Sequence, residues 1–170
     1  MDKHFEEFLL KLFGPEFFEV YKANAMARLE ILKHFEMMKR KFNPGVDERS
    51  RLQLNFLGEE LSGPKLTEFV KKYNEREEAE AAEQERKPAK CTQRGMSSID
   101  LPPALMTSFF EPLFEKIIAK VLELMQAARD KKAPVNLIFM VGGFSESPFL
   151  KSRVKKLFSE GESKPDQPQV

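Results

Sequence analysis

The feature that most constrains the fold is the uncharged stretch 135–141, which ends at two glycines. All of its residues are apolar except Asn136, and it is too short to cross a membrane. Such a run is typical of a strand that is covered on both faces. Gly142 and Gly143 then permit a sharp turn, and the Ser-Pro pair 147–148 supplies an N-cap and a first helical position. The stretch therefore predicts a buried strand that turns directly into a helix.

This succession of strand, glycine turn and helix has two interpretations. The amide groups at such a helix start suit an anion or a polar sugar. The same succession also occurs in many α/β units that bind no ligand, and its spacing differs from the G-x-G-x-x-G fingerprint of dinucleotide-binding folds. Taken alone, the stretch leaves a ligand site and a purely structural turn both open.

Helical periodicity predicts most of the remaining elements. An amphipathic helix that ends at Gly14 is expected from the spacing of Phe5, Phe8, Leu9, Leu12 and Phe13. A second helix, from about residue 24 to 42, is expected from the stripe Ile31, Phe35, Met38 and Phe42. A third opens at the proline pair 102–103, and Pro112 within it predicts a kink or a fresh start. A last helix is marked by Leu150, Val154 and Leu157.

The middle of the chain predicts a strand pair and a polar insertion. Leu52, Leu54 and Phe56 alternate with their neighbours, which fits a short strand whose partner is the stretch 96–101. The run 71–90 is the most polar part of the chain and offers no apolar stripe to bury, so we expect an exposed, partly helical insertion. A solvated face is favoured there over a partner-binding role. The elements together predict an α/β fold, with a helix-rich α+β fold as the alternative.

Composition excludes several classes of protein. The 28 lysines and arginines nearly balance the 27 aspartates and glutamates, so no global basic field indicates nucleic-acid binding. Cys91 is the only cysteine, which excludes an internal disulfide and favours a reducing compartment. Its spacing from His4 and His34 is not that of metal ligands. We therefore expect a soluble domain, or a piece of one, with no membrane span and no metal site, in the cytoplasm or the nucleus.

The second predicted helix carries four polar residues on one face. Glu36, Lys39, Arg40 and Asn43 follow one another at helical spacing beside the apolar stripe. One interpretation is a solvated surface with an intrahelical pair between Glu36 and Arg40. The other is a ligand site, because a carboxylate and an ammonium can hydrogen-bond the hydroxyls of a ribose and a guanidinium can lie on a purine.

Two motifs together resemble a known family. The helix segment FEMMKRKFN at 35–43 and the later IFMVGGFSESP at 138–148 are similar to segments of the 70-kDa heat-shock protein family, in the actin-like ATPase superfamily. Within that family the chain resembles the divergent 12A/12B branch. The segment 2–14, the Gly-Met pair 95–96 before the proline-opened helix, and the polar insertion also match that branch.

The resemblance implies a partial lobe II of the heat-shock nucleotide-binding domain over residues 1–160. It implies a polar insertion at 65–92 and a loose tail at 161–170. The phosphate loops of the family, and the lobe I carboxylates and lysine around magnesium, have no counterpart in this sequence. Because phosphoryl transfer depends on charge stabilisation around the transferring phosphate, no catalytic residue is expected, and magnesium would bind only through lobe I.

The resemblance also assigns a nucleotide-binding wall to particular residues. These are Glu36, Lys39, Arg40, Asn43, Gly142, Gly143, Phe144 and Glu146. Glu36 and Lys39 match the family's ribose contacts, and Arg40 matches the arginine that stacks on adenine; the asparagine matches a small polar adenine contact and the glycines line the adenosine. Phe144 and Glu146 replace a serine and an arginine of the family, which weakens the expected hold on the adenine from that side.

These features lead to three hypotheses about function. The first is an ATP- or ADP-binding fragment of a chaperone-related protein, with weak or lost affinity in the isolated chain. The second is an incomplete gene model of a full ATP-dependent chaperone-like ATPase. The third is a non-catalytic interaction module that binds a protein partner through the interlobe face or the insertion 65–92. An uncovered interlobe face also predicts marginal solubility or self-association.

Overall fold

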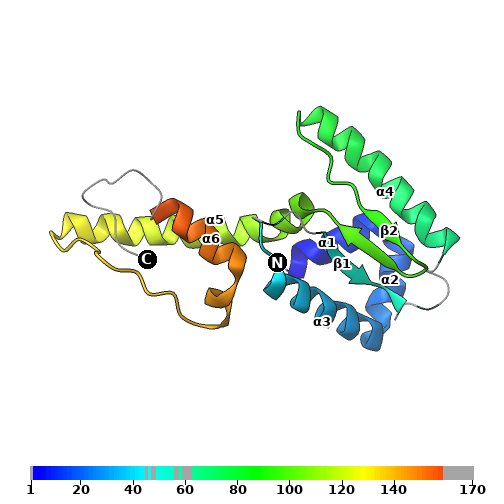
Figure 1. Cartoon of the computed structure of the whole chain (residues 1–170), viewed down its shortest axis with the longest axis horizontal. Helices are drawn as coiled ribbons and strands as arrows, with labels where there is room; N and C mark the ends of the chain where they lie inside the picture. Colours follow the sequence, from blue (N-terminus) through cyan, green and yellow to red (C-terminus); the bar gives the residue numbers. More distant parts are fainter. Residues whose placement is uncertain (1, 45, 47–48, 56–57, 59–62, 159–170) are drawn as a thin grey trace. The chain divides into compact units, whose positions relative to one another are not determined.

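The computed structural model divides into two compact units, and each is described by itself (Figure 1). The first unit comprises residues 1–39 and 47–109, and the second comprises 40–46 and 110–170. The structure describes residues 2–44, 46, 49–55, 58 and 63–158. The expected tail 161–170 and the strand residue Phe56 lie outside the described residues.

The first unit begins with three helices, α1 (Asp2–Phe13), α2 (Pro15–Ala23) and α3 (Ala25–Lys41). The five apolar residues that predicted α1 are all buried, so that prediction is confirmed. Helix α2 was not predicted. Gly14 ends α1 with a φ of 83°, a conformation that favours glycine, and Pro15 at once provides the first position of a new helix. The same dipeptide therefore ends one helix and begins the next.

Helix α3 follows its predicted range and helps to form the core of the first unit. Asn24 caps it, because the Asn24 Oδ1 atom accepts a hydrogen bond of 3.0 Å from the amide of Ala27. The ring of Phe35 stacks on Phe5 of α1 with 3.9 Å between the centroids, and both rings meet Phe109 edge-on. Edge-to-face and stacked pairs of this kind stabilise a core beyond their buried area.

A three-stranded antiparallel sheet completes the first unit together with helix α4 (Pro64–Glu83). Its strands are β1 (Ser50–Gln53), β2 (Thr92–Arg94) and β3 (Ser98–Leu101), in the order β1-β3-β2. The predicted pairing of β1 with the stretch that contains β3 is confirmed, whereas β2 was not predicted. The fold is helix-rich α+β, which was the alternative to the expected α/β fold.

Helix α4 covers much of the polar run and corrects the expectation that this run has nothing to bury. The helical part of that expectation is confirmed. One stripe of α4 is buried at steps of four and three, and it consists of Leu66, Val70, Tyr73, Glu77 and Ala81. The stripe was missed because a glutamate occupies one of its positions and the apolar residues are thinly spread. Burial of Glu77 is compensated, since its Oε1 atom accepts a hydrogen bond of 2.8 Å from the amide of Ala89 and pairs with Arg86.

The second unit contains the later part of α5 (Pro103–Asp130), the 3-10 helix η3 (Gly143–Glu146) and α6 (Pro148–Phe158). Helix α5 runs through Pro112 without interruption, so a fresh start there is wrong. Proline removes one helical hydrogen bond, but the buried rings of Phe110 and Phe114 on either side hold the helix in place. The predicted cap of α6 is confirmed, because the amide of Leu150 lies 3.5 Å from the Oγ atom of Ser147.

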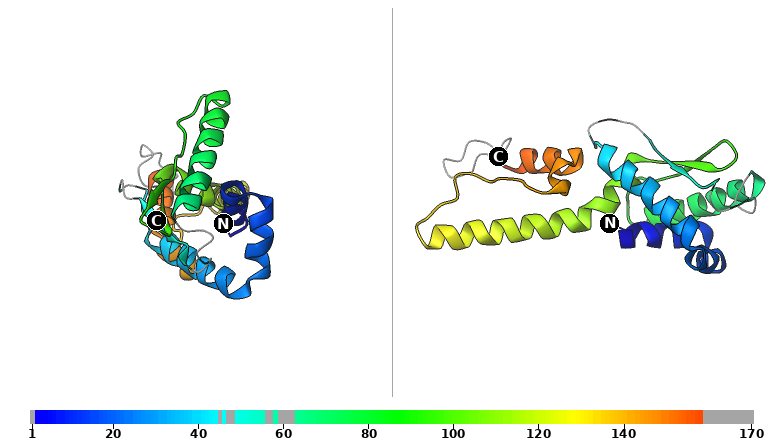
Figure 2. Two further views of the ribbon diagram at one scale, coloured as in Figure 1. Left: turned by 90° about the vertical axis from the view of Figure 1, so that its right-hand side faces the viewer. Right: turned by 90° about the horizontal axis from the view of Figure 1, so that it is seen from below.

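The stretch 135–141 is not the buried strand that its composition predicts. It returns from the end of α5 to η3 as an extended loop, with a single bridge position at Leu137 (Figures 1 and 2). Leu137, Phe139 and Val141 are 51%, 79% and 84% exposed. In the described part of the chain the three-stranded sheet β1-β3-β2 does not include this stretch, so the stretch lacks the neighbouring strands that would bury it on both faces.

Candidate functional site

The first part of the predicted site lies on α3, where Lys39 is held by two carboxylates. Its Nζ atom is 2.6 Å from Glu36 Oε2 and 2.8 Å from Asp2 Oδ1. The ammonium also lies 5.0 Å from the centroid of the Phe35 ring. Only 11% of the Lys39 side chain is exposed, whereas 48% of the Glu36 side chain is exposed. The predicted ribose contacts therefore form an ion pair with each other.

The environment of Lys39 keeps its ammonium charged. Burial lowers the pKa of the amine, but the hydrogen bonds and charges of Asp2 and Glu36 outweigh that effect, so the pKa is raised above its ordinary value. An ammonium has three N–H donors, and two carboxylates engage two of them. A ribose hydroxyl would have to use the third donor or displace Asp2, whose side chain is 67% exposed.

The remaining helical positions, Arg40 and Asn43, are exposed and belong to the second unit. Both also interact with other residues of the chain. Between them Phe42 is buried, which orients the polar residues on either side of it toward the surface. The interpretation of this face as a solvated surface with a Glu36 to Arg40 pair stays a prediction.

The glycine pair forms the sharp turn that the sequence predicts. Gly142 has a φ of 87°, and its carbonyl accepts hydrogen bonds from the Ser145 amide at 3.0 Å and the Ser145 Oγ atom at 2.6 Å. A Cβ atom added to Gly142 or Gly143 would meet nothing within 4 Å. Glycine is therefore needed at Gly142 for its backbone conformation, and the space beside both residues is open.

A cluster of phenylalanine rings joins these two segments within the second unit. Phe110 stacks on Phe42 at 5.5 Å, on Phe149 at 4.7 Å and on Phe144 at 6.5 Å between centroids. Phe42 follows Arg40 by two positions and Phe144 directly follows the glycine pair. The segment at the end of α3 and the segment that follows the glycine turn thus both pack on Phe110.

The cluster also explains one departure from the family pattern. Phe144 is half-buried and its ring packs on Phe110, so it serves the core of the second unit in this structure. Glu146 is exposed at the end of η3. Glu36 and Lys39 belong to the first unit, so the predicted ribose contacts and the predicted adenine contacts lie in different units.

Across the described residues no group of three His, Cys, Asp or Glu side chains is placed to hold a metal ion.

The thiol of Cys91 is buried in the first unit. Burial raises the pKa of this thiol to about 12, so the thiol stays protonated and is a poor nucleophile at neutral pH. Its backbone is fixed by two hydrogen bonds of 2.9 Å with the amide side chain of Asn74. Cys91 is structural.

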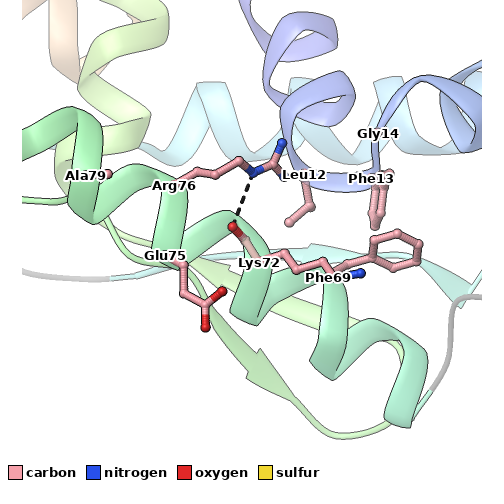
Figure 3. Close-up of a pocket in the computed structure, with 8 residues that line it drawn as sticks. All are labelled: Leu12, Phe13, Gly14, Phe69, Lys72, Glu75, Arg76 and Ala79. Atoms are coloured by element: carbon pink, nitrogen blue, oxygen red, sulfur yellow. Dashed lines mark hydrogen bonds between the residues drawn. The ribbon is translucent and has the colours of Figure 1, made fainter.

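A groove of about 530 Å³ between the end of α1 and α4 was not predicted from the sequence (Figure 3). The edge-on rings of Phe13 and Phe69 line it, with centroids 5.5 Å apart. Arg76 also lines it, but donates to the carbonyls of Lys72, at 3.2 Å, and of Lys11. These bonds join α4 to the last turn of α1. The groove arises where the end of α1 meets one face of α4, two segments far apart in the sequence, so no local sequence signal marks it.

Comparison with known proteins gives matches to heat shock 70 kDa protein 12A from two mammals. Heat shock 70 kDa protein 12A of Homo sapiens is 26% identical to this chain over 162 residues, and so is its counterpart in Mus musculus. The chain is a distant relative of heat shock 70 kDa protein 12A. The aligned residues are 94% of this chain but only 22% of those relatives, so the chain spans about a fifth of their length. No family model and no solved structure matches the chain.

The match supports the resemblance inferred from the sequence motifs, at the level of a distant relationship. It extends over almost the whole chain and therefore includes both units. Among the helices of the described residues, none combines the length and the apolar character that a bilayer crossing requires.

Proposed function

We propose that this chain forms the adenosine-facing part of a nucleotide-binding domain related to that of the 70-kDa heat-shock proteins. The 26% identity to heat shock 70 kDa protein 12A over 94% of the chain carries the proposal. In this proposal Glu36 and Lys39 contact the ribose, and Arg40 and Asn43 contact the adenine. Gly142 and Gly143 line the other side of the adenosine, next to Phe144 and Glu146.

The geometry of the second unit supports the adenine half of this site. The buried ring of Phe42 and the half-buried ring of Phe144 both stack on Phe110, so the segments that carry Arg40 and the glycine pair pack on one aromatic cluster. Arg40 is exposed, and the glycines leave open space. A planar guanidinium beside open backbone suits the face of a purine. The aromatic cluster thus anchors the backbone that carries the Arg40 side chain.

The proposed site binds nucleotide weakly and does not hydrolyse it. The Lys39 ammonium is already paired with Asp2 and Glu36, so ribose binding must compete with contacts inside the chain. The sequence contains no phosphate loop to stabilise the transferring phosphate. ATP and ADP would therefore bind with similar affinity, because the proposed contacts involve only the adenosine that they share. Magnesium would add nothing in this chain.

Calorimetric titration with ATP, ADP and adenosine tests the proposal. We expect weak binding at millimolar ligand, which Arg40→Ala reduces by about tenfold because a stacked guanidinium contributes on the order of 1 kcal/mol or more. The matched control is Arg129→Ala, which removes an exposed guanidinium at the end of α5 in the same unit. Absence of binding by all three ligands, or equal affinity of Arg40→Ala and the wild-type chain, would contradict a retained site.

A second candidate is that the chain is one part of a longer ATP-dependent chaperone-like ATPase. The observation that favours it is the length of the relatives, of which the chain spans 22%. The missing phosphate contacts would then come from other segments. The genomic sequence upstream of the Met1 codon tests this candidate, since it would have to encode both phosphate loops.

A third candidate is a non-catalytic interaction module. Leu137, Phe139 and Val141 favour it, because three strongly exposed apolar side chains on one short segment are typical of a surface that binds another protein. The polar helix α4 offers a second surface. Proteolytic removal of residues 65–92 without any loss of partner binding would exclude α4 and leave the apolar segment.

A further inference from the structure

The polar face of the three-stranded sheet carries a group of charged side chains that the proposed nucleotide site does not use. Strand alternation places Leu52 of β1 and Ile99 of β3 opposite each other on the inner face, where both are fully buried. On the outer face Asp100 of β3 lies opposite Arg51 of β1 and Thr92 of β2. Arginines from both outer strands therefore meet above the central strand.

A single carboxylate holds two of these arginines. Asp100 accepts a hydrogen bond of 2.9 Å from Arg51 Nε on its Oδ1 atom and one of 2.8 Å from Arg94 Nε on its Oδ2 atom. The Asp100 side chain is 5% exposed, whereas the arginine side chains are 57% and 58% exposed. The carboxylate thus lies beneath the two guanidiniums. Bonding through Nε leaves the Nη groups, which carry four of the five N–H donors of each guanidinium, for other acceptors.

A third guanidinium completes the group. Arg49 precedes β1 and donates a hydrogen bond of 3.0 Å from Nη1 to the Oγ1 atom of Thr92, the residue opposite Asp100 on β2. Among the described residues, these three guanidiniums and one carboxylate carry a net charge of +2. The two arginines on Asp100 are oriented before any ligand arrives, so little side-chain entropy remains to be lost on binding.

Among the described residues, the surroundings of Arg49 leave room for a ligand and do not neutralise its charge. A groove of about 640 Å³ begins at Arg49 and runs between α4 and β2. The acidic residues that line it are already paired, Glu75 with Lys71 and Glu78 with Lys90. The positive charge of the sheet face is therefore not cancelled from that side.

We propose that Arg49, Arg51 and Arg94 form a binding site for a phosphate monoester. The planar guanidinium fork matches phosphate oxygens, and a monoester dianion balances the charge of +2. The phosphate group is either a free anion or part of a phosphorylated side chain of a protein partner. This site lies wholly in the first unit and does not depend on nucleotide binding by Arg40.

Titration calorimetry of the full chain at low ionic strength tests the site. The probes are inorganic phosphate, a phosphoserine peptide with uncharged flanking residues, and the same peptide without phosphate. We expect binding of the first two at concentrations up to about 1 mM and none of the third. Tighter binding of the phosphopeptide would identify a phosphorylated partner as the source, and equal affinity would identify the phosphate group alone.

Two variants and a matched control make the test specific. Arg49→Gln should weaken phosphopeptide binding by about tenfold, because one charged fork is lost. It does not disturb the folding of the sheet, since Arg49 does not bond Asp100. Lys120→Gln removes the same charge from an exposed side chain of α5, and should bind like the wild-type chain.

The double variant Arg51→Lys/Arg94→Lys keeps the charge but loses the forks, and should also bind more weakly. The circular dichroism spectrum of the double variant reports whether the sheet is intact. If the sheet is disrupted, the phosphopeptide affinity of Arg49→Gln is the test of the site. The proposal is overturned if neither phosphate nor the phosphopeptide binds. It is equally overturned if the unphosphorylated peptide binds as well, or if Arg49→Gln and Lys120→Gln bind alike.

Discussion

Helix α4 and the segment 135–141 differ in how far their side chains are buried. Helix α4 is rich in charged residues, yet it buries a continuous stripe from Leu66 to Ala81 against the rest of the first unit. The segment 135–141 is almost entirely apolar, yet Phe139 and Val141 are among the most exposed apolar residues described. A helix satisfies its own peptide groups and needs only one apolar face, whereas a strand needs neighbours for both. Whether a segment is buried therefore depends more on the elements that pack against it than on its mean hydropathy.

The same contrast applies to buried charge. Glu77 is buried within the stripe of α4, but its carboxylate accepts hydrogen bonds from the Ala89 amide and from Arg86. These two bonds hold the segment that runs from the end of α4 to β2 against the helix. The apolar segment has no equivalent anchor among the described residues. Substitutions at anchored and at exposed positions should therefore differ strongly in their effect on stability.

The largest effect is expected from a ring at the centre of the aromatic cluster. Phe110→Ala should lower the free energy of unfolding by about 3–5 kcal/mol, because Phe110 is 1% exposed and stacks on three other rings. Phe139→Ala is the control, with a change within about 0.5 kcal/mol, since its ring is 79% exposed. Urea unfolding measures both. Similar losses for the two variants would mean that the segment 135–141 is anchored as firmly as the cluster.

Glu77→Ala should lower the free energy of unfolding by about 3 kcal/mol, because the change leaves Arg86 and the buried Ala89 amide without their acceptor. The neighbouring Glu78→Ala removes an exposed carboxylate that pairs with Lys90, and should cost less than about 1 kcal/mol. Chemical denaturation of the two variants provides the comparison. A loss for Glu78→Ala as large as that for Glu77→Ala would refute the role of the buried position.

Acid should destabilise the first unit through its buried carboxylates. Burial raises the pKa of Glu77 and of Asp100, but hydrogen bonds from their arginine partners, and from the Ala89 amide to Glu77, outweigh it, so each pKa lies below its ordinary value of 4.5 or 3.8. Their stabilisation is thus complete above those values and is lost as the pH falls through the folded-state pKa.

Unfolding followed between pH 7 and pH 2 measures this loss. Glu77→Gln should show a shallower decline than the wild-type chain, because the variant lacks one of the two buried carboxylates whose pKa is lowered in the folded state. A wild-type stability that stays constant down to pH 3 would show that these ion pairs do not link folding to protonation.

The smallest effect on stability, but a clear effect on association, is expected for the apolar segment. Val141→Lys should leave the free energy of unfolding within about 0.5 kcal/mol, because Val141 is 84% exposed. It should lower the tendency of the chain to self-associate, since a charge interrupts an apolar edge. Sedimentation velocity over a range of concentrations measures this. A wild-type chain that is strictly monomeric would contradict the expected self-association.

The sequence predicted the elements whose stability is local. The stripes from Phe5 to Phe13 and from Ile31 to Phe42, and the cap at Ser147, depend on residues within a few positions of one another, so α1, α3 and α6 were found. The alternation around Leu52 and the stretch 96–101 were enough to predict one strand pair. Strand β2 was missed because three residues carry too little periodicity to be recognised.

The candidate site was predicted in part. Helical spacing placed Glu36, Lys39 and Arg40 on one helix, and the glycine pair does form a sharp turn. The engagement of Lys39 by Asp2 depends on a contact between distant parts of the chain. So does the stacking of Phe144 on Phe110, which gives that ring a structural role. No local pattern reveals either contact.

The amino-acid sequence alone was enough to predict most of the helices, the cap at Ser147, the glycine turn and a distant relationship to heat shock 70 kDa protein 12A, because each depends on residues close in the chain or on motifs that can be aligned. Which surfaces are covered was set by the tertiary structure. The tertiary structure buried Glu77, left Phe139 in solvent and joined Arg51 and Arg94, from two different strands, on Asp100. The physical reason is that burial and charge pairing are properties of neighbours in space, and these neighbours are far apart in the sequence.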